Sequence, residues 1–271
     1  MNLITIEDIR EYWDKMINNT QVLRSNSNNY GGELKFNDFS LTEFEIMKNW
    51  RYSLVNSIFK IIVNESKNYN EKKILEIGCG IGIDAMELIK RGGKVTGIDL
   101  SPQSIKLAER YRDLNNYEGT FQLGNAEKLE FEKNFFDIIW SFGVLHHTPN
   151  IKKAIDEVYR VLKPGGIGYI GLYYKYSYLM FFHKILKQNL EFQSEDAPII
   201  NCYSTKDIKK MWGHKFIIKD IQIIIPPTPT CRKGFKEKIY NMIFVKLWNH
   251  FPILTNYFGA GIYFQIFKPL N

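Results

Sequence analysis

The sequence predicts an α/β fold, in which a mostly parallel seven-stranded sheet carries helices on both faces. Three observations support this. Short apolar runs alternate with segments of helical periodicity over residues 73–172. Glycines follow several of these runs, as expected where a buried strand turns into a helix. Two more strand-like runs occupy residues 216–225 and 261–267. Because alternating strands and helices form right-handed βαβ units, the sheet is expected to be parallel over most of its width.

The strand predictions rest on apolar runs that end in glycine or in a polar residue. The first run leads into a glycine-rich turn, and the second ends at Asp99. Together with the two C-terminal runs they supply the seven strands, at residues 73–77, 94–98, 120–123, 136–141, 167–172, 216–225 and 261–267.

The helix predictions use end signals as well as periodicity. Ser101 is a good N-cap and Pro102 suits the first helical turn, so a helix is expected from there to residue 113. Ser204 predicts a second capped start, for a helix that reaches Trp212. Apolar spacing predicts further helices over residues 6–17, 41–64, 83–91 and 151–162.

Composition bounds the functional classes. The net charge is +7 with a pI near 9.0, but the lysines are spread along the chain and only residues 232–238 form a basic cluster. Cys79, Cys202 and Cys231 are scattered, which disfavours a disulfide framework and favours a reducing cytoplasm. The first residues lack the basic and apolar regions of an export signal. His183, His214 and His250 are not spaced like metal ligands, so no metal site is expected.

The candidate ligand site follows the first two strands. The turn Glu76-Ile77-Gly78-Cys79-Gly80-Ile81-Gly82 lets the backbone approach a ligand closely, and Asp99 ends the next strand about 20 residues on. A terminal acid at that distance can accept both hydroxyls of a ribose. The third glycine of a dinucleotide fingerprint would fall on Ile83, which disfavours a nicotinamide cofactor. Glu76 would repel a pyrophosphate but suits the cationic S-adenosylmethionine.

These residues resemble the class I S-adenosylmethionine-dependent methyltransferases, most closely the broad bacterial small-molecule group. Five motifs occur in the family's order between residues 72 and 172. They are the glycine turn after residues 74–77, Gly97-Ile98-Asp99-Leu100-Ser101, Gly124-Asn125-Ala126-Glu127-Lys128-Leu129, the segment 136–147, and Val161-Leu162-Lys163-Pro164-Gly165-Gly166. Asn125 departs from the family, which usually has aspartate there, although its carbonyl can still accept from an adenine amino group.

The resemblance implies a Rossmann-like core and a set of cofactor contacts. Asp99 would hold the ribose, Leu100 would cover the adenine, and Glu76 would act nearby through backbone or water. The glycine turn would lie against the methionine part, and the Ser141 carbonyl would approach its amine. The implied cofactor residues are Glu76, Gly78, Cys79, Gly80, Gly82, Asp99, Leu100, Asn125, Ala126, Glu127 and Ser141.

Two further groups of residues are candidates on the acceptor side. His146 and His147 follow the fourth strand, where a histidine could take a proton from an acceptor hydroxyl or ammonium. The alternative is that they pack or cap the loop before Pro149. Tyr12 and Trp13 could close over the cofactor as part of an N-terminal lid. They could equally anchor a helix on the core, as could Tyr30 and Arg51.

The expected organisation is an N-terminal helical cap (1–70), a cofactor-binding core (71–172) and a segment that completes the sheet (173–271), all in one structural domain. Aromatic insertions at 173–182 and 239–258 would form an apolar acceptor pocket. The basic, aromatic stretch 233–248 could contact a membrane surface. A packed helix or an oligomer contact is the alternative, and the oligomeric state stays open. Polar residues interrupt this stretch, so it is not expected to span a membrane.

The function that follows is methyl transfer from S-adenosylmethionine to a small or lipid-like acceptor, with a histidine as candidate general base. The basic pI motivates a nucleic-acid-modifying enzyme as an alternative. Residues 141–144 do not resemble the Pro-Pro-aromatic motif of amino-methylating DNA enzymes, and no RNA-binding module stands out. A cofactor-binding partner protein without catalysis is another alternative, because an intact glycine turn shows only a capacity to bind.

Overall fold

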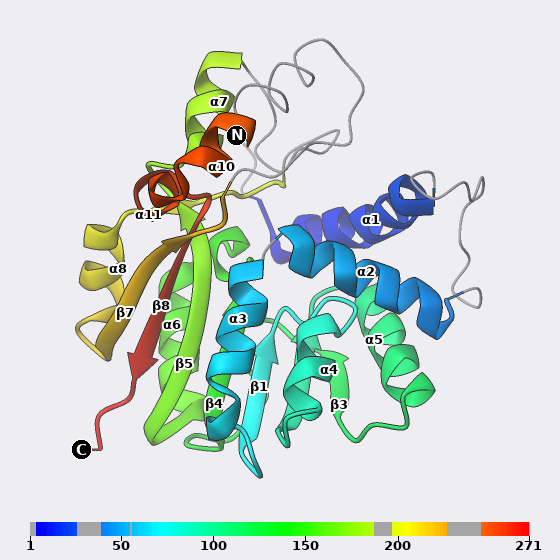
Figure 1. Ribbon diagram of the computed structural model, residues 1–271. Coiled ribbons are helices and arrows are strands. Elements are labelled where there is room, and N and C mark those ends of the chain that lie inside the picture. Colours follow the sequence, from blue (N-terminus) through cyan, green and yellow to red (C-terminus); the bar gives the residue numbers. More distant parts are fainter. Residues whose placement is uncertain (1–3, 26–38, 55, 187–196, 227–244, 271) are drawn as a thin grey trace.

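The computed structural model describes residues 4–25, 39–54, 56–186, 197–226 and 245–270 (Figure 1). Its centre is a sheet with strand order β3-β2-β1-β4-β5-β8-β7, and the short β6 pairs with the end of β5. The strands are β1 Lys73–Ile77, β2 Lys94–Asp99, β3 Thr120–Leu123, β4 Phe136–Phe142, β5 Leu162–Tyr174, β6 Cys202–Tyr203, β7 Ile217–Ile224 and β8 Gly261–Phe267.

The direction of the strands sets where a ligand can bind. The five strands from β3 to β5 are parallel, whereas β8 runs antiparallel between β5 and β7. The chain order reverses at β1, which has β2 on one side and β4 on the other. In an open parallel sheet the loops separate at such a reversal and leave a crevice at the carboxyl ends of the strands.

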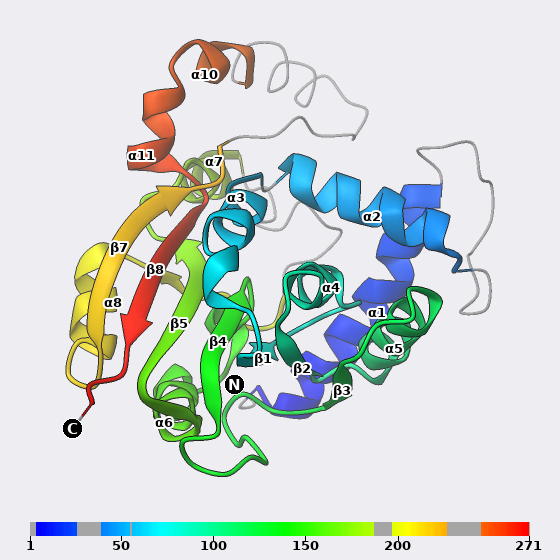
Figure 2. The same ribbon diagram turned by 60° about the horizontal axis from the view of Figure 1, so that its bottom comes forward.

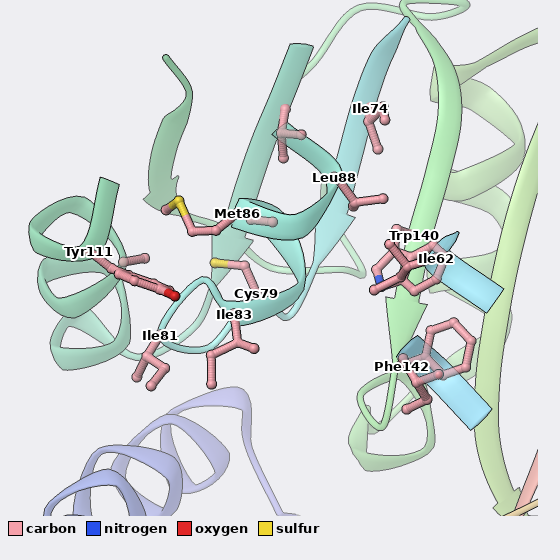
Figure 3. Packing of buried hydrophobic residues seen from close by; sticks show 14 of the residues in the cluster. Ile62, Ile74, Cys79, Ile81, Ile83, Met86, Leu88, Tyr111, Trp140 and Phe142 are labelled. Atoms are coloured by element: carbon pink, nitrogen blue, oxygen red, sulfur yellow. The ribbon is translucent and has the colours of Figure 1, made fainter. Parts of the chain in front are cut away.

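Helices cover both faces of the sheet, and each face has its own apolar core. The helices are α1 Ile6–Ser25, α2 Leu41–Leu54, α3 Asn56–Asn64, α4 Ile83–Ile89, α5 Pro102–Leu114, α6 Ile151–Val161, α7 Tyr178–Leu186, α8 Thr205–Trp212, α10 Lys246–His250 and α11 Thr255–Phe258. One core joins α3, α4 and α5 to the sheet through side chains such as Ile62, Met86 and Tyr111 (Figure 3). The other joins α6 and α8 through Val158 and Trp212.

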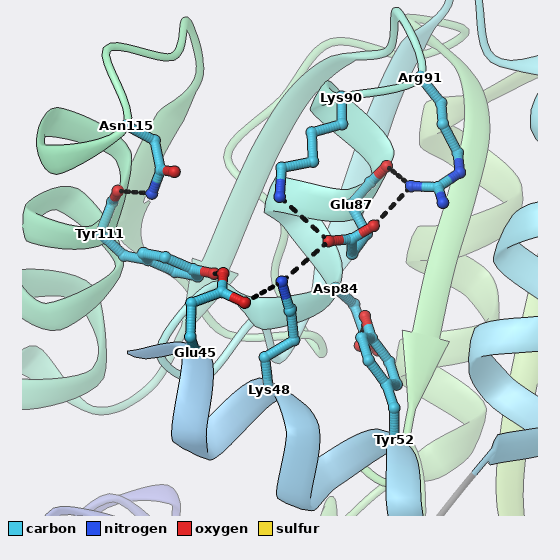
Figure 4. Close-up of polar contacts among 9 residues, drawn as sticks. All are labelled: Glu45, Lys48, Tyr52, Asp84, Glu87, Lys90, Arg91, Tyr111 and Asn115. Atoms are coloured by element: carbon cyan, nitrogen blue, oxygen red, sulfur yellow. Dashed lines mark hydrogen bonds and ion pairs between the residues drawn. The ribbon is translucent and has the colours of Figure 1, made fainter. Parts of the chain in front are cut away.

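The N-terminal helices α1 and α2 lie above α4 and α5 in Figure 1, at the carboxyl end of the sheet, and Figure 2 shows α1 passing behind α5. Charged contacts attach α2 to α4, since Lys48 bridges Glu45 of its own helix and Glu87 of α4 (Figure 4). Lys90 and Arg91 complete this ion network around Glu87. The network positions α2 so that it forms one wall of the crevice.

The structure confirms the predicted fold class and refines several boundaries. Ser101 caps α5 by accepting from the Ser104 N–H at 3.1 Å, and Ser204 forms a capping box with Asp207. The single helix expected over residues 41–64 is in fact two helices, α2 and α3. The break between them was not predicted because the apolar spacing continues across it. The seven-strand prediction missed β6, which at two residues is too short to show periodicity.

Some predictions concern residues that the structure does not describe. Tyr30, Cys231, the basic cluster 232–238 and residues 227–244 of the C-terminal insertion lie outside the described residues. Within the described residues, none of the helices is long and apolar enough to cross a membrane. The same residues contain no group of three or more His, Cys, Asp or Glu that could hold a metal ion.

Candidate active site

A cavity of about 320 Å³ lies at the carboxyl ends of the strands, between the glycine turn, the loop after β4 and the helices α1 and α2. Its wall combines many of the residues that the sequence singled out. These are Trp13, Gly78, Gly80, Asp99, Leu100, Asn125, Ala126 and His147. Further lining residues include Ile9, Met47, Arg51, Phe142, Gly143 and Val144. Apolar walls with a few convergent polar groups are typical of small-molecule sites.

The three glycines of the turn have three different physical roles, although all have positive φ. A Cβ on Gly78 would lie 2.2 Å from Cγ2 of Val144, so the loop after β4 needs this glycine for close packing. A Cβ on Gly82 would lie 3.2 Å from Cβ of Ala108, at the contact of α4 with α5. Nothing lies within 4 Å of a Cβ on Gly80, which lines the cavity, so among the three glycines of the turn only Gly80 faces open space.

Asp99 is held by the backbone in a fixed orientation. Its Oδ2 accepts from the Gly80 N–H and its Oδ1 from the Ser101 N–H, both at 2.9 Å. Burial raises the pKa of Asp99, and these two N–H groups oppose that shift. Each carboxylate oxygen has a second lone pair, so the group can accept further hydrogen bonds from a ligand.

A buried charge cluster lies behind the turn. Asp84 of α4 accepts from Nε and Nη2 of Arg51 at 2.8 and 2.6 Å, and from the Tyr52 hydroxyl at 3.0 Å. Trp140 Nε1 donates to the same carboxylate. This bidentate pair fixes Arg51 of α2 in the cavity wall. The sequence left Arg51 undecided and missed Asp84, whose only signal is an acid in the first turn of a helix that follows a glycine turn.

Glu76 lies beside this cluster but does not line the cavity. The residue is only 4% exposed, and its Oε2 has no hydrogen-bond partner within the described part of the chain. Burial raises the pKa of Glu76 well above its usual value, and the nearby Asp84 raises it further, while Arg51 opposes the shift. A buried carboxyl group with an unsatisfied oxygen would gain free energy from a cation placed close to it.

The segment after β3 forms one end of the cavity. Asn125 Oδ1 accepts from the Glu127 N–H at 2.8 Å, which sets the orientation of the amide. Ala126 is buried next to it and also lines the cavity. Glu127 instead accepts from the Asn150 N–H at the start of α6, at 2.6 Å. Glu127 does not line the cavity, and its implied contact with the cofactor stays a prediction.

The two adjacent histidines have different environments. The ring of His147 lines the cavity, and its Nδ1 lies 2.7 Å from the Ile199 carbonyl oxygen. Because a carbonyl oxygen only accepts, Nδ1 carries a proton in this contact. His146 is fully buried under Tyr173, with ring centroids 4.0 Å apart. Burial lowers the pKa of His146 well below its usual value, as does the neighbouring His147.

The helix α1 covers the cavity from the N-terminal side. Trp13 lines the wall, and its ring meets that of His147 edge to face at 5.1 Å. Tyr12 does not line the cavity, since it is buried against Ala197. Asp14 accepts from the Ser101 hydroxyl and from the Gln103 N–H, which ties α1 to the start of α5. The aromatic pair is thus divided between the cavity and the core.

The remaining predicted residues lie behind the wall. Cys79 is buried in the core under the turn, and burial raises the pKa of its thiol well above the usual value. Ser141 donates from its hydroxyl to the Ile77 carbonyl at 3.2 Å and is likewise buried. Their side chains support the strand ends and leave the cavity surface to the glycines.

The segment that forms most of this cavity matches a known protein family. Residues 75–170 match the family model described as "Methyltransferase domain". The match runs from β1 into β5 and includes the glycine turn, Asp99, Asn125 and both histidines. This segment is a class I S-adenosylmethionine-dependent methyltransferase domain.

Curated relatives match between 35% and 42% of this chain. A phthiotriol/phenolphthiotriol dimycocerosates methyltransferase of Mycobacterium leprae is 38% identical over 101 residues, which are 36% of this chain and 37% of that protein. A ubiquinone biosynthesis O-methyltransferase of Rickettsia akari is 31% identical over 113 residues, 42% and 45% of the two chains. A sterol 24-C-methyltransferase of Aspergillus fumigatus is 33% identical over 98 residues, 35% and 26%. The chain thus matches less than half of these relatives' own lengths.

Solved structures share the fold of the methyltransferase domain over a longer span. An S-adenosylmethionine-dependent methyltransferase from Methanosarcina mazei superposes with a TM-score of 0.55 at 24% identity, over 76% of this chain and 97% of that one. The YcgJ protein of a Bacillus species does so with a TM-score of 0.57 at 20% identity, over 77% and 97%. At these identities the likeness concerns the fold.

Proposed function

We propose that this chain transfers a methyl group from S-adenosylmethionine to a small or lipid-like acceptor. The observation that carries the proposal is the composition of the 320 Å³ cavity. Two groups of residues line it: Gly80, Asp99 and Asn125 at the ends of the first three strands, and Trp13 and His147, whose rings are in contact. One cavity therefore offers a nucleoside site and, next to it, a site for an acceptor.

The residues present fit an adenosyl cofactor with a positive charge. When bound, S-adenosylmethionine supplies an activated methyl group on a sulfonium. Asp99 is positioned to accept from ribose hydroxyls, and the open space over Gly80 leaves room for the ligand that a side chain would fill. Glu76 lies behind the cavity wall, from where its buried, unsatisfied carboxyl group would attract a cationic ligand. Arg51 offers a fixed guanidinium to the carboxylate of the methionine part.

His147 is the proposed general base, in preference to His146. Its Nδ1–H is held by the Ile199 carbonyl, so Nε2 is the ring atom that would take a proton. For a hydroxyl acceptor, the oxygen forms a bond to the methyl carbon as the carbon–sulfur bond breaks, and the hydroxyl proton passes to Nε2 of His147. His146 lies under Tyr173, and its low pKa keeps it neutral as a packing residue.

Two observations support an apolar acceptor. The three relatives are named for ubiquinone biosynthesis, for sterols and for phthiotriol dimycocerosates, which are lipid-like molecules. The cavity wall itself carries apolar side chains, among them Ile9, Met47 and Phe142. A phenolic ring with one ionisable hydroxyl and an apolar substituent suits a wall of this kind together with a single base.

The test is calorimetric titration of the purified chain with S-adenosylhomocysteine, followed by methyl-transfer assays on a panel of quinols, sterols and other phenols. The expected result is saturable binding that Asp99→Ala weakens by roughly 100-fold, since two hydrogen bonds to a charged group are lost. Asp113→Ala, at an exposed position of α5, is the matched control and should bind as the wild type does. Absence of binding by the wild type would refute the proposal.

A further inference from the structure

The exposed aromatic side chains of the described chain are concentrated in one region. Twelve large hydrophobic residues are exposed among the described residues, and the aromatic ones all lie between β5 and β8 in the sequence, on or beside α7 and the segment from α10 to α11. We call the surface formed by Tyr176, Phe251, Ile253, Tyr257 and Phe258 the aromatic face. These residues are between 47% and 62% exposed.

A small internal core holds these side chains outward. Tyr178 of α7 packs edge to face on Trp248 of α10, with ring centroids 5.6 Å apart, and Leu254 packs against the same cluster. Trp248 Nε1 also donates to the Thr255 hydroxyl at 3.0 Å, which fixes α10 to α11. Since Trp248 and Leu254 point inward, the intervening and following residues of the aromatic face remain on the surface.

The charged residues of the two segments that carry the aromatic face are all basic. Residues 173–186 and 245–260 contain no aspartate or glutamate. Lys184 of α7 and Lys246 of α10 are both exposed there. Aromatic and aliphatic side chains beside lysines, without acids, match the interface of a bilayer with anionic lipids, where rings insert at the headgroup level and lysines pair with phosphates.

The aromatic face is also close to the proposed acceptor side. Tyr173 packs against both histidines, with its ring centroid 5.8 Å from that of His147. Tyr176 follows it by only three residues, and α7 begins at the carboxyl end of β5. Figure 1 shows α7, α10 and α11 grouped at the same end of the sheet as α1 and α2.

We infer that the aromatic face docks the protein on the surface of an anionic lipid bilayer, next to the cavity. Its use in presenting a membrane-dissolved acceptor to His147 rests on the proposed function, whereas the docking itself does not. Exposed apolar side chains favour association with another apolar surface, and the lysines favour one that carries negative charge.

The test is co-sedimentation of the full chain with vesicles of phosphatidylcholine alone and with about one third phosphatidylglycerol. The wild type is expected to bind the anionic vesicles, less so at high salt. Phe251→Ser/Ile253→Ser/Tyr257→Ser should reduce partitioning by about tenfold or more because three inserted side chains are lost. Lys184→Gln/Lys246→Gln should weaken binding to anionic vesicles specifically. Ile217→Ser/Leu270→Ser, exposed on the β7 side and near the C-terminus, is the matched control and should bind as the wild type.

Three results would overturn the inference. One is no wild-type binding to either vesicle, and another is equal binding by the triple serine variant. The third is a wild-type dimer in sedimentation that the triple variant makes monomeric while vesicles bind neither protein, because a second copy would then cover the face. Titration with S-adenosylhomocysteine separates this inference from the proposed function. A variant that binds S-adenosylhomocysteine normally but no longer binds vesicles has a folded cofactor site and has lost only the docking surface.

Discussion

The two sides of the cavity are built in different ways. The adenosyl side is made by backbone groups and one acid within a short stretch, since Gly80 and Asp99 are joined directly by a hydrogen bond. The acceptor side is assembled from distant segments, because Trp13, His147 and Ile199 meet only in the folded protein. A local backbone motif tolerates little variation in its geometry, whereas side chains from separate loops can change without altering the fold. We therefore expect substitutions on the proposed acceptor side to alter acceptor binding more readily than the fold.

The largest expected effect sharpens this comparison on the acceptor side. His147→Ala should reduce turnover with a hydroxyl acceptor by roughly 100-fold or more, because a general base contributes about that factor. Affinity for S-adenosylhomocysteine should stay within twofold. His146→Ala is the matched control, and its main effect should be on thermal stability because it empties a buried site. Steady-state kinetics with both variants decide the point; equal turnover losses would contradict the assignment to His147.

The glycine turn supplies a second way to separate packing from ligand binding. Gly78→Ala should lower the free energy of unfolding by about 2–3 kcal/mol, since its Cβ meets Val144 at 2.2 Å and its φ is +74°. Gly80→Ala should cost about 1 kcal/mol, because only the strain of a φ of +52° remains. Chemical denaturation measures both values. Calorimetry should show weaker cofactor binding for Gly80→Ala; unchanged affinity would mean that the ligand does not approach this residue.

Glu76 should show opposite effects on stability and binding. Its pKa in the folded protein lies above the usual 4.5. The contribution of Glu76 to the free energy of unfolding is therefore fully present below pH 4.5 and is lost as the pH rises through the folded pKa. Glu76→Gln removes this loss and should raise the melting temperature at neutral pH. The same variant should bind the cationic S-adenosylmethionine about tenfold more weakly, equal to one pKa unit of interaction. Thermal melts and calorimetry over pH check this; a lower melting temperature would contradict it.

The smallest expected effect concerns the departure from the family at Asn125. Asn125→Asp keeps the acceptor for the Glu127 N–H and adds a negative charge facing the adenine end. A charge-assisted hydrogen bond is stronger than a neutral one, so affinity for S-adenosylhomocysteine should rise by about threefold. Calorimetry measures the change. Asn125→Ala, which removes the acceptor, should instead weaken binding, and equal affinities for all three proteins would place the adenine elsewhere.

Much of the fold and half of the site were predictable because their determinants are local. The alternation of strands with helices, the caps at Ser101 and Ser204, and the acid at the end of β2 all act over a few residues. The direction of a side chain was not predictable in the same way. The side chains of Cys79 and Ser141 face the core, whereas the predicted contact of Ser141 concerned its backbone carbonyl and stays a prediction.

The sequence by itself determined the parallel strands, the glycine turn and the acid at the end of β2, because periodicity and backbone conformation depend on neighbouring residues. Only the tertiary structure decided which histidine lines the cavity, that Arg51 is anchored by Asp84, and that Tyr12 is buried while Trp13 reaches the site. Those outcomes depend on contacts between segments far apart in the chain, and the direction of a side chain there follows from packing and burial rather than from its own sequence context.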